Sequence, residues 1–399
     1  MKGNRAVNRP SACSIIAGLG VILLLAGCAV RPETPSDTQD TKIQLTRVDF
    51  SNLPGWGKDA ELHGAVSAFI KTCNRFTRRS DSYDMGGAGY AGTVGQWRPF
   101  CDAAATLPIY QAKTWFEQNF QPYQVSSGLE KNGLFTGYYE PSLTASLKKT
   151  YKYHVPIHAR PHDLIMVDLG DFRESLKGQR IAGTVKDGHL KPFSNRADII
   201  AGSMDGDVSV LAYADDPVAV FFLHIQGSGR IFLPDGSTKR LGYAAQNGHP
   251  YFAIGRELIA RGELTRENVS LQTIEAWLKA NPDQSQALMN TNKSYVFFRE
   301  LPESGPIGAA GVVLTPGRSL AVDRTLHPLG IPMWLSTTAK YPDGVERLIQ
   351  RMVIAQDTGG AIAGAVRGDV FWGSGDDAKF LAGHMKQSGT LYVLLPKFL

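Results

Sequence analysis

Two aspartates near the C-terminus lie at the ends of apolar, strand-like runs. The run 352–355 leads to Asp357 and the pair Gly359-Gly360, and twelve residues after Asp357 comes Asp369, followed by the apolar run 370–372. Short apolar runs with β-branched members are typical of buried strands. Two carboxylates held in this way suit general acid/base chemistry on an acetal bond. Asp is also common in turns, so the spacing alone leaves a structural role open.

Other kinds of reactive site have little support. The nine histidines are scattered without an HExxH pattern, and there is no CxxC. His158 and His162 are four residues apart, but Pro156 and Pro161 disfavour a helix that would bring them together. Gly227-Ser228-Gly229 does not form a GxSxG nucleophile motif, and phosphate-loop motifs are absent. We therefore expect neither a metal nor a cofactor.

Several polar and aromatic residues could contact a sugar. Gln226, Ser228 and Arg230 place polar groups on a glycine-rich backbone, which could bind hydroxyl groups or simply form a barrel corner. Aromatic side chains can stack on sugar rings but more often belong to the core. The remaining candidates are aromatic, amide or carboxylate side chains at strand ends and in loops: Tyr138, Glu140, Asn247, Tyr251, Asp323 and Trp372.

Length and charge set broad limits on the protein. The 399 residues are enough for two or more domains, and the composition is that of a globular protein. The formal charge is +5, but three of the basic residues precede Cys28 and no acidic residue does. Without that segment the charge falls to +2. This is no argument for nucleic-acid binding, which usually calls for a concentrated basic patch.

The N-terminus predicts export and lipid attachment. Lys2, Arg5 and Arg9 precede the apolar segment 15–25, which is too short to span a bilayer comfortably. The segment leads into Leu25-Ala26-Gly27-Cys28, which resembles a bacterial lipobox with Cys28 as the acylated residue. The residue after it, Ala29, points to an outer-membrane lipoprotein on the periplasmic face. An ordinary signal peptide cleaved nearby is the alternative.

Two further cysteines remain in the mature chain. In an oxidising compartment Cys73 and Cys101 could form a disulfide, or they could be two buried thiols. Spacing does not decide between these alternatives, because it does not give their distance in space.

Periodicity predicts a mainly β fold with helical additions. Helices are expected near 59–73, 103–120, 253–261, 271–280 and 376–385, and strands near 134–141, 155–161, 294–299, 311–315, 332–335, 352–355, 370–372 and 391–395. The run 218–233 reads as one strong strand interrupted at the Gly-Ser-Gly corner, with a hairpin turn at 234–236. Short strands with glycine corners favour β-barrels over a doubly wound sheet.

Several long motifs, in order, resemble the membrane-bound lytic murein transglycosylase A family. They occupy residues 135–141, 221–230, 242–251 and 314–323, and the C-terminal block resembles the family's three-aspartate domain, with Asp323, Asp357 and Asp369 as the three acids. The resemblance runs from about residue 50 to the end, and the lipobox agrees with it independently.

The resemblance implies a fold and a domain plan. It implies a double-psi β-barrel domain and a second, smaller β-barrel domain, with a groove for a glycan strand between them. The expected boundaries are a signal peptide at 1–27, the lipidated Cys28 with a tether to 45, a larger domain at 46–141 and 243–399 and an inserted domain at 142–242. The three-aspartate region covers about 310–397.

The resemblance also implies a reaction. It is the nonhydrolytic exolytic cleavage of the β-1,4 bond between N-acetylmuramic acid and N-acetylglucosamine, forming a 1,6-anhydro ring. Asp369 would act as acid and then as base, with Asp357 in support. The expected substrate-binding residues are Tyr138, Glu140, Gln226, Ser228, Arg230, Asn247, Tyr251, Asp323, Thr358 and Trp372.

Two other functions fit parts of the same pattern. One is a two-carboxylate hydrolase of the muramidase type, with Asp357 as base. The other is a non-catalytic peptidoglycan-binding lipoprotein. The expected partners are peptidoglycan glycan strands, outer-membrane lipid through Cys28, and other cell-wall enzymes.

Overall fold

The computed structural model describes residues 43–398, apart from 177–178, 205, 207 and 303–304. The expected signal peptide, Cys28 and most of the expected tether lie outside the described residues. Among the residues that are described, none of the helices combines the length and hydrophobicity needed to cross a lipid bilayer.

Six strands close into a barrel, which confirms the expectation of a mainly β fold. Around the barrel they are β3 (Gly133–Glu140), β16 (Arg367–Ser374), β13 (Ser319–Val322), β15 (Glu346–Asp357), β14 (Pro332–Lys340) and β17 (Lys386–Pro396). The ring is closed because β17 pairs with both β14 and β3. The β3–β16 and β13–β15 pairs are parallel and the other pairs are antiparallel. Strands β1 (Ile43–Arg47) and β2 (Phe120–Ser127) extend the sheet beyond β17.

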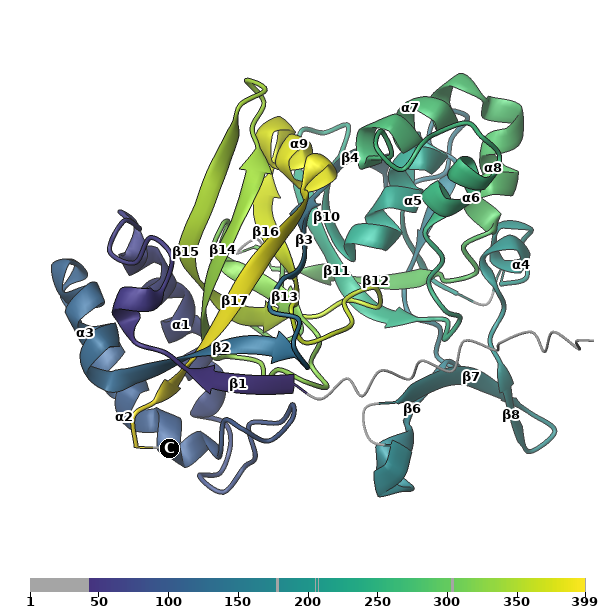
Figure 1. Cartoon of the computed structure of the whole chain (residues 1–399). Coiled ribbons are helices and arrows are strands. Elements are labelled where there is room, and N and C mark those ends of the chain that lie inside the picture. The colour runs from purple at the N-terminus through teal and green to yellow at the C-terminus, as the bar shows by residue number, and fades with distance from the viewer. Residues whose placement is uncertain (1–42, 177–178, 205, 207, 303–304, 399) are drawn as a thin grey trace, which may run out of the picture. The chain divides into compact units, whose positions relative to one another are not determined.

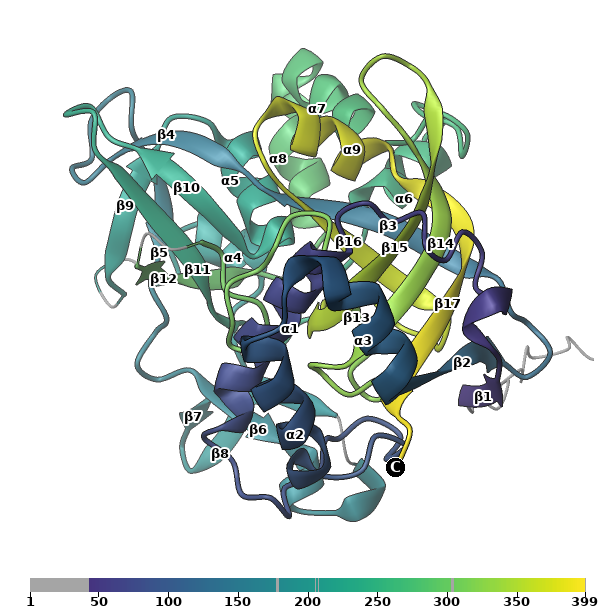
Figure 2. The ribbon, with the colours of Figure 1, turned by 90° about the vertical axis from the view of Figure 1, so that its left-hand side faces the viewer.

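Three N-terminal helices cover one side of the barrel: α1 (Leu62–Phe76), α2 (Val94–Ala105) and α3 (Ala112–Asn119). Figure 2 shows them in front of the barrel strands. The amide of Gln356, on β15, donates to the Ala68 carbonyl of α1 at 2.7 Å, which ties helix to barrel. Cys73 and Cys101 form a disulfide that links α1 to α2. The sequence predicted α1. The helix expected at 103–120 covers α3 but only the end of α2, and the 106–111 segment interrupts it.

A second, smaller sheet has six strands in the order β12 (Val296–Leu301), β11 (Thr238–Gln246), β10 (Ser228–Phe232), β4 (Ser142–Ser146), β9 (Val210–Ala214) and β5 (Val155–His158). A parallel bridge between Ala159 and Phe298 brings its two edges together. The turn at 234–236 joins β10 to β11 as predicted. This sheet draws on β12, beyond the predicted insertion at 142–242, and the domain boundary itself stays a prediction.

The remaining elements surround these sheets (Figure 1). A three-stranded sheet contains β6 (Ile165–Asp168), β7 (Arg180–Lys186) and β8 (His189–Pro192). The helices are α4 (Arg196–Ile200), α5 (Pro217–Gln226), α6 (Ile254–Ala260), α7 (Leu271–Ala280), α8 (Pro282–Asn290) and α9 (Asp376–His384). Helices α6, α7 and α9 match the expected segments. The expected strand at 311–315 is wrong, since only an isolated bridge between Ile307 and Val313 forms there.

The prediction of a strand from residue 218 is also wrong, because this segment is the helix α5. Asp216 caps the helix by accepting a hydrogen bond from the Val218 amide at 2.7 Å, Pro217 occupies the first turn, and Gly227 ends it at a φ of 76°. Two separate apolar clusters meet the helix, one formed with the second sheet and one with α6, α7 and α8. A helix buried on opposite sides is apolar all round and shows no helical period.

A buried ion pair between Arg318 and Asp59 links the barrel to the segment before α1. Both side chains are 6% exposed, the two N–O distances are 2.5 and 2.6 Å, and Asp59 also accepts from the Met352 amide.

Asp59→Asn leaves the guanidinium buried without its counter-charge, so we expect the free energy of unfolding to fall by about 3–5 kcal/mol in urea titrations. Asp343→Asn removes the exposed pair with Arg347 and should lower the stability far less, because water screens that pair. Equal losses in the two variants would contradict this expectation.

Candidate active site

Asp369 lies on β16, between two strands that come from distant parts of the sequence. In the strand register it is opposite Thr136 of β3 and Ala321 of β13. The Thr136 hydroxyl donates to Asp369 Oδ1 at 2.7 Å, and the Arg367 guanidinium donates to the same hydroxyl oxygen at 2.9 Å. Asp369 remains partly accessible, whereas its neighbours Gly368 and Val370 are buried.

The surroundings of Asp369 favour its protonated form. Burial is the largest effect and, with a smaller contribution from the negative charge of Asp357, raises the pKa of Asp369 to about 6. The Thr136 hydrogen bond and the Arg367 charge act in the opposite direction. A carboxyl group with this pKa can donate a proton near neutral pH and can also accept one afterwards.

Asp357 is held far more tightly than Asp369. It ends β15, where its Oδ2 accepts from the Tyr138 hydroxyl at 2.8 Å. Its Oδ1 accepts from the Ala309 amide at 2.8 Å and the Thr358 amide at 2.9 Å. Burial raises the pKa of Asp357, while these three donors lower it. The donors fix the position of the carboxylate and occupy both of its oxygens.

The short strand β13 brings the two acids into one site. Ala321 pairs with Asp357 on one side and with Asp369 on the other. Two interstrand spacings put the backbones of the two acids roughly 10 Å apart. Tyr138, two residues after Thr136, lies on the same face of β3, so one strand supplies a donor to each acid.

Asp323 anchors the loop that joins the two acid-bearing strands. Its Oδ1 accepts from the amide and hydroxyl of Thr325, and its Oδ2 accepts from the Gly364 amide at 2.9 Å. The Thr358 hydroxyl donates to the Val322 carbonyl at 2.8 Å, on the other end of the same loop. Both residues were expected to bind substrate, and these contacts favour a structural role for their side chains.

The glycine-rich segment 78–98 packs against the neighbouring 324–329 loop, whose His327 contacts the loop between the acids. The Ala88 amide donates to the Leu326 carbonyl, and Gly87, at a φ of 63°, approaches the backbone of Pro328 so closely that a Cβ would lie 2.7 Å from its nitrogen. His327 Nε2 donates to the Ala365 carbonyl at 2.7 Å, so its Nδ1 accepts from the Tyr90 hydroxyl at 2.7 Å. Burial lowers the pKa of His327, which agrees with this neutral ring.

Of three other expected binding residues, Trp372 lies on β16, Tyr251 lies near Asp369 and Gln226 contacts β3. Trp372 follows it on β16, with the Arg351 guanidinium 5.8 Å from the ring centre. The Trp372 indole nitrogen is buried without a hydrogen-bond partner among the described residues. Tyr251 is 39% exposed, and the charge of Asp369 contributes to raising its pKa after the larger effect of burial. The Gln226 side chain accepts from the Tyr139 amide at 3.1 Å, which links the end of α5 to β3.

The other expected binding residues are engaged in the protein interior. Glu140 is 2% exposed and pairs with Arg240 at 2.6 Å and with Arg230 at 3.7 Å. Ser228 is buried in β10. Asn247 donates to the carbonyls of Ser194 and Lys293, both at 2.9 Å, and is 1% exposed. These contacts favour structural roles for Glu140, Ser228 and Asn247.

Sequence reasoning missed Thr136 and Arg367, the two residues in the hydrogen-bond chain to Asp369. The period of two along β3 could have indicated Thr136, since it shares a face with the chosen Tyr138. Arg367 gave no comparable signal, because its contact crosses to a strand more than 200 residues away. Within the described parts of the chain, no group of three or more His, Cys, Asp or Glu side chains could hold a metal ion.

Known proteins share both the sequence and the fold. A family model described as "MltA specific insert domain" matches residues 134–299, and one described as "3D domain" matches residues 318–395. Membrane-bound lytic murein transglycosylase A of Vibrio cholerae is 30% identical over 386 residues, which cover 95% of this chain and 94% of that protein. The Escherichia coli K12 protein of the same name is 32% identical over 271 residues, or 66% of each chain.

Solved structures extend this likeness. A membrane-bound lytic murein transglycosylase from Agrobacterium tumefaciens has a TM-score of 0.77 and 34% identity, covering 89% of this chain and 98% of that one. MltA of Escherichia coli with bound chitohexaose has a TM-score of 0.62 and 25% identity, covering 91% of this chain and 97% of that one.

The raised pKa of Asp369 has a consequence for stability that can be measured. The fold favours the protonated form, so this group's stabilising contribution is complete below the unfolded pKa of about 3.9 and is lost as the pH rises through about 6. Asn does not ionise. Asp369→Asn should therefore match the wild type near pH 4 and exceed it by about 1–3 kcal/mol at pH 7.5 in urea unfolding. Asp49→Asn, at an exposed site, serves as control. If the stability difference between Asp369→Asn and the wild type were the same at both pH values, the assignment would be refuted.

Proposed function

This chain belongs to the membrane-bound lytic murein transglycosylase A family, and we propose that Asp369 is the single acid and base with which it cleaves peptidoglycan. The activity is that of a peptidoglycan lytic transglycosylase. The proposal concerns the bond, the residues and their roles. The bond is the β-1,4 link between N-acetylmuramic acid and N-acetylglucosamine, and the action is exolytic.

The observation that carries this assignment is the unequal hydrogen bonding of the two carboxylates. Asp357 accepts three hydrogen bonds, two of them from backbone amides, and its oxygens are committed to the fold. Asp369 accepts one hydrogen bond from a described residue, although the two carboxylates are equally half-buried. A hydrolase with Asp357 as base would need that carboxylate to bind and deprotonate a water. The contacts of Asp357 therefore favour a reaction with one acid.

In the first step, protonated Asp369 gives its proton to the glycosidic oxygen as the bond to C1 of the muramoyl ring breaks. A pKa of about 6 leaves roughly a tenth of the groups protonated at pH 7, about a hundred times more than an unperturbed aspartate would have. The negative charge of Asp357 contributes to this, after the larger effect of burial.

In the second step, the Asp369 carboxylate takes the proton of the C6 hydroxyl of the same ring. The C6 oxygen then bonds to C1, which closes the 1,6-anhydro ring and restores the protonated acid without consuming water. Thr136 donates to Asp369 Oδ1 and fixes the carboxyl group through both steps, and Arg367 fixes Thr136. These two are positioning residues.

Two aromatic side chains, the exposed Tyr251 and the half-buried Trp372, are proposed to hold the glycan. Trp372 and Tyr251 offer ring faces for sugar stacking, and Tyr251 brings a loop from beyond β11 near the acid. The relative solved with bound chitohexaose supports glycan binding in this fold. We further propose a larger domain at 46–141 and 243–399 with an inserted domain at 142–242, acylation at Cys28, an outer-membrane location facing the periplasm, and other cell-wall enzymes as partners.

The main test uses the products of sacculus digestion. Asp369→Asn should lower the rate by at least about 10²–10⁴-fold while leaving binding to sacculi intact, because the amide has no proton to transfer but a similar shape. Mass spectrometry of the wild-type products should show 1,6-anhydro ends. Reducing N-acetylmuramic acid ends would instead identify a two-carboxylate hydrolase, and full activity in the variant would exclude Asp369 as the acid.

A second test addresses Thr136. Its hydrogen bond lowers the pKa of Asp369, so Thr136→Val should move the alkaline limb of the kcat/KM profile upward by roughly half a unit to one unit. Thr136→Ser keeps the hydroxyl and should restore the wild-type profile. A purely packing role for Thr136 predicts lower activity in both variants with no displacement of the profile.

A further inference from the structure

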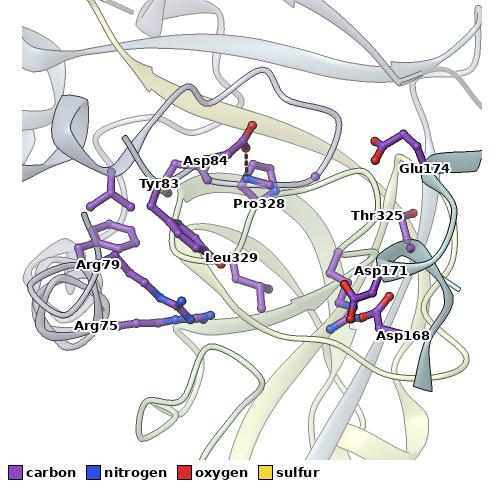
Figure 3. A pocket seen from close by; sticks show the side chains of 17 residues that line it. Arg75, Arg79, Tyr83, Asp84, Asp168, Asp171, Glu174, Thr325, Pro328 and Leu329 are labelled. Atoms are coloured by element: carbon purple, nitrogen blue, oxygen red, sulfur yellow. Dashed lines mark hydrogen bonds between the residues drawn. The ribbon is translucent and has the colours of Figure 1, made fainter. Parts of the chain in front are cut away.

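A cavity of about 600 Å³ lies beside the loop that follows Asp323, and the roles assigned so far do not use it. Figure 3 shows its lining, which comes from three separate segments. One is the end of α1 with the glycine-rich segment, another is the 324–329 loop, and the third is 168–174, at the end of β6. A volume of this size can enclose a ligand of several residues.

One wall of the cavity is cationic. Arg75 lies in the last turn of α1 and Arg79 just beyond its end, and both line the cavity. Burial and then repulsion from Arg79 lower the pKa of Arg75. The Arg79 guanidinium lies over the Tyr83 ring at 4.4 Å. Neither arginine forms an ion pair with a carboxylate of the described residues, in contrast to the buried Arg318.

The opposite wall carries acidic side chains. Asp168, Asp171 and Glu174 line it, across the cavity from Arg75 and Arg79 (Figure 3). Asp168 already pairs with Arg180 at 3.1 Å, and its charge also raises the pKa of Arg324 against the larger effect of burial. Apolar groups from Phe76, Met85 and Leu329 also line the cavity. The cavity therefore suits a ligand with carboxylates at one end, an ammonium at the other and an aliphatic part between them.

The cavity is close to the catalytic acid. Arg324 and Thr325 line it, and they follow β13, whose Ala321 is paired with Asp369. Three residues of extended chain and one interstrand spacing put the Arg324 backbone no more than roughly 16 Å from that of Asp369. A short length of glycan can bridge this distance, so a group carried by the bound strand can reach the cavity.

We propose that this cavity binds the stem peptide of the glycan strand, with its carboxylates at Arg75 and Arg79. This rests on peptidoglycan being the substrate. Stem peptides carry free carboxylates and, where they are not cross-linked, a free amine. A sugar ring would bind by stacking on an open aromatic face. The cavity does not offer the Tyr83 ring for this, because Arg79 covers it. The acidic wall selects stems whose amine is free, since cross-linking turns that amine into an amide.

The test compares two substrates with one pair of variants. Wild type, Arg75→Gln/Arg79→Gln and Arg78→Gln are assayed on peptide-bearing strands and on strands stripped of peptide by an amidase. Arg78 is exposed in the same turn and does not line the cavity, so it is the matched control for loss of charge. The double variant should lose at least about tenfold in kcat/KM on peptide-bearing strands, because charge-assisted hydrogen bonds are lost. Its rate on stripped strands should not change.

Two further measurements complete the test. A synthetic stem peptide, free of sugar, should bind wild type but not the double variant in calorimetric titrations, and acetylation of its amine should weaken binding. The peptide titration separates this proposal from the catalytic one, because it does not require cleavage. Equal losses on both substrates, or no peptide binding by wild type, would overturn the proposal.

Discussion

The pairing of β3 with both β16 and β17 is the constraint on which the site depends. It closes the barrel, and it lays a strand from residues 133–140 against strands from the last forty residues of the chain. Thr136 and Tyr138 then meet Asp369 and Asp357 from one face of β3. Without this closure the two carboxylates would lose their side-chain donors and the burial that raises the pKa of Asp369.

Asp357 and Asp369 have different hydrogen-bond partners in the barrel. Both acids end up at the sides of Ala321, and burial raises the pKa of each. The backbone amides of Ala309 and Thr358 offset this at Asp357, whereas Asp369 meets a single hydroxyl. One carboxylate thus becomes part of the scaffold while the other stays free to exchange a proton. The same logic of unequal surroundings separates acid and base roles in other carboxylate enzymes.

The loop between the acids is held by chain neighbours of the residues that line the cavity. Asp323 and His327 hold the loop at Gly364 and Ala365, and the glycine-rich segment packs behind His327 through Tyr90 and Gly87. The same segment and the residues after Asp323 line the cavity. A ligand bound there would contact the elements that support the loop leading to Asp369. This gives the glycine-rich segment a structural role close to the catalytic residues.

The sequence by itself determined the strands that carry the acids and the helices α1, α6, α7 and α9. Its motifs also predicted a barrel and a reaction. Local signals suffice where period and turn residues act over a few positions, as at α1, α7 and the 234–236 turn. They failed at α5, where burial from two sides erased the helical period. Tertiary structure alone decided the disulfide, the Thr136 and Arg367 contacts and the interior positions of Glu140 and Asn247. Each of these depends on strands or helices that are distant in sequence, and spacing along the chain carries no information about such distances.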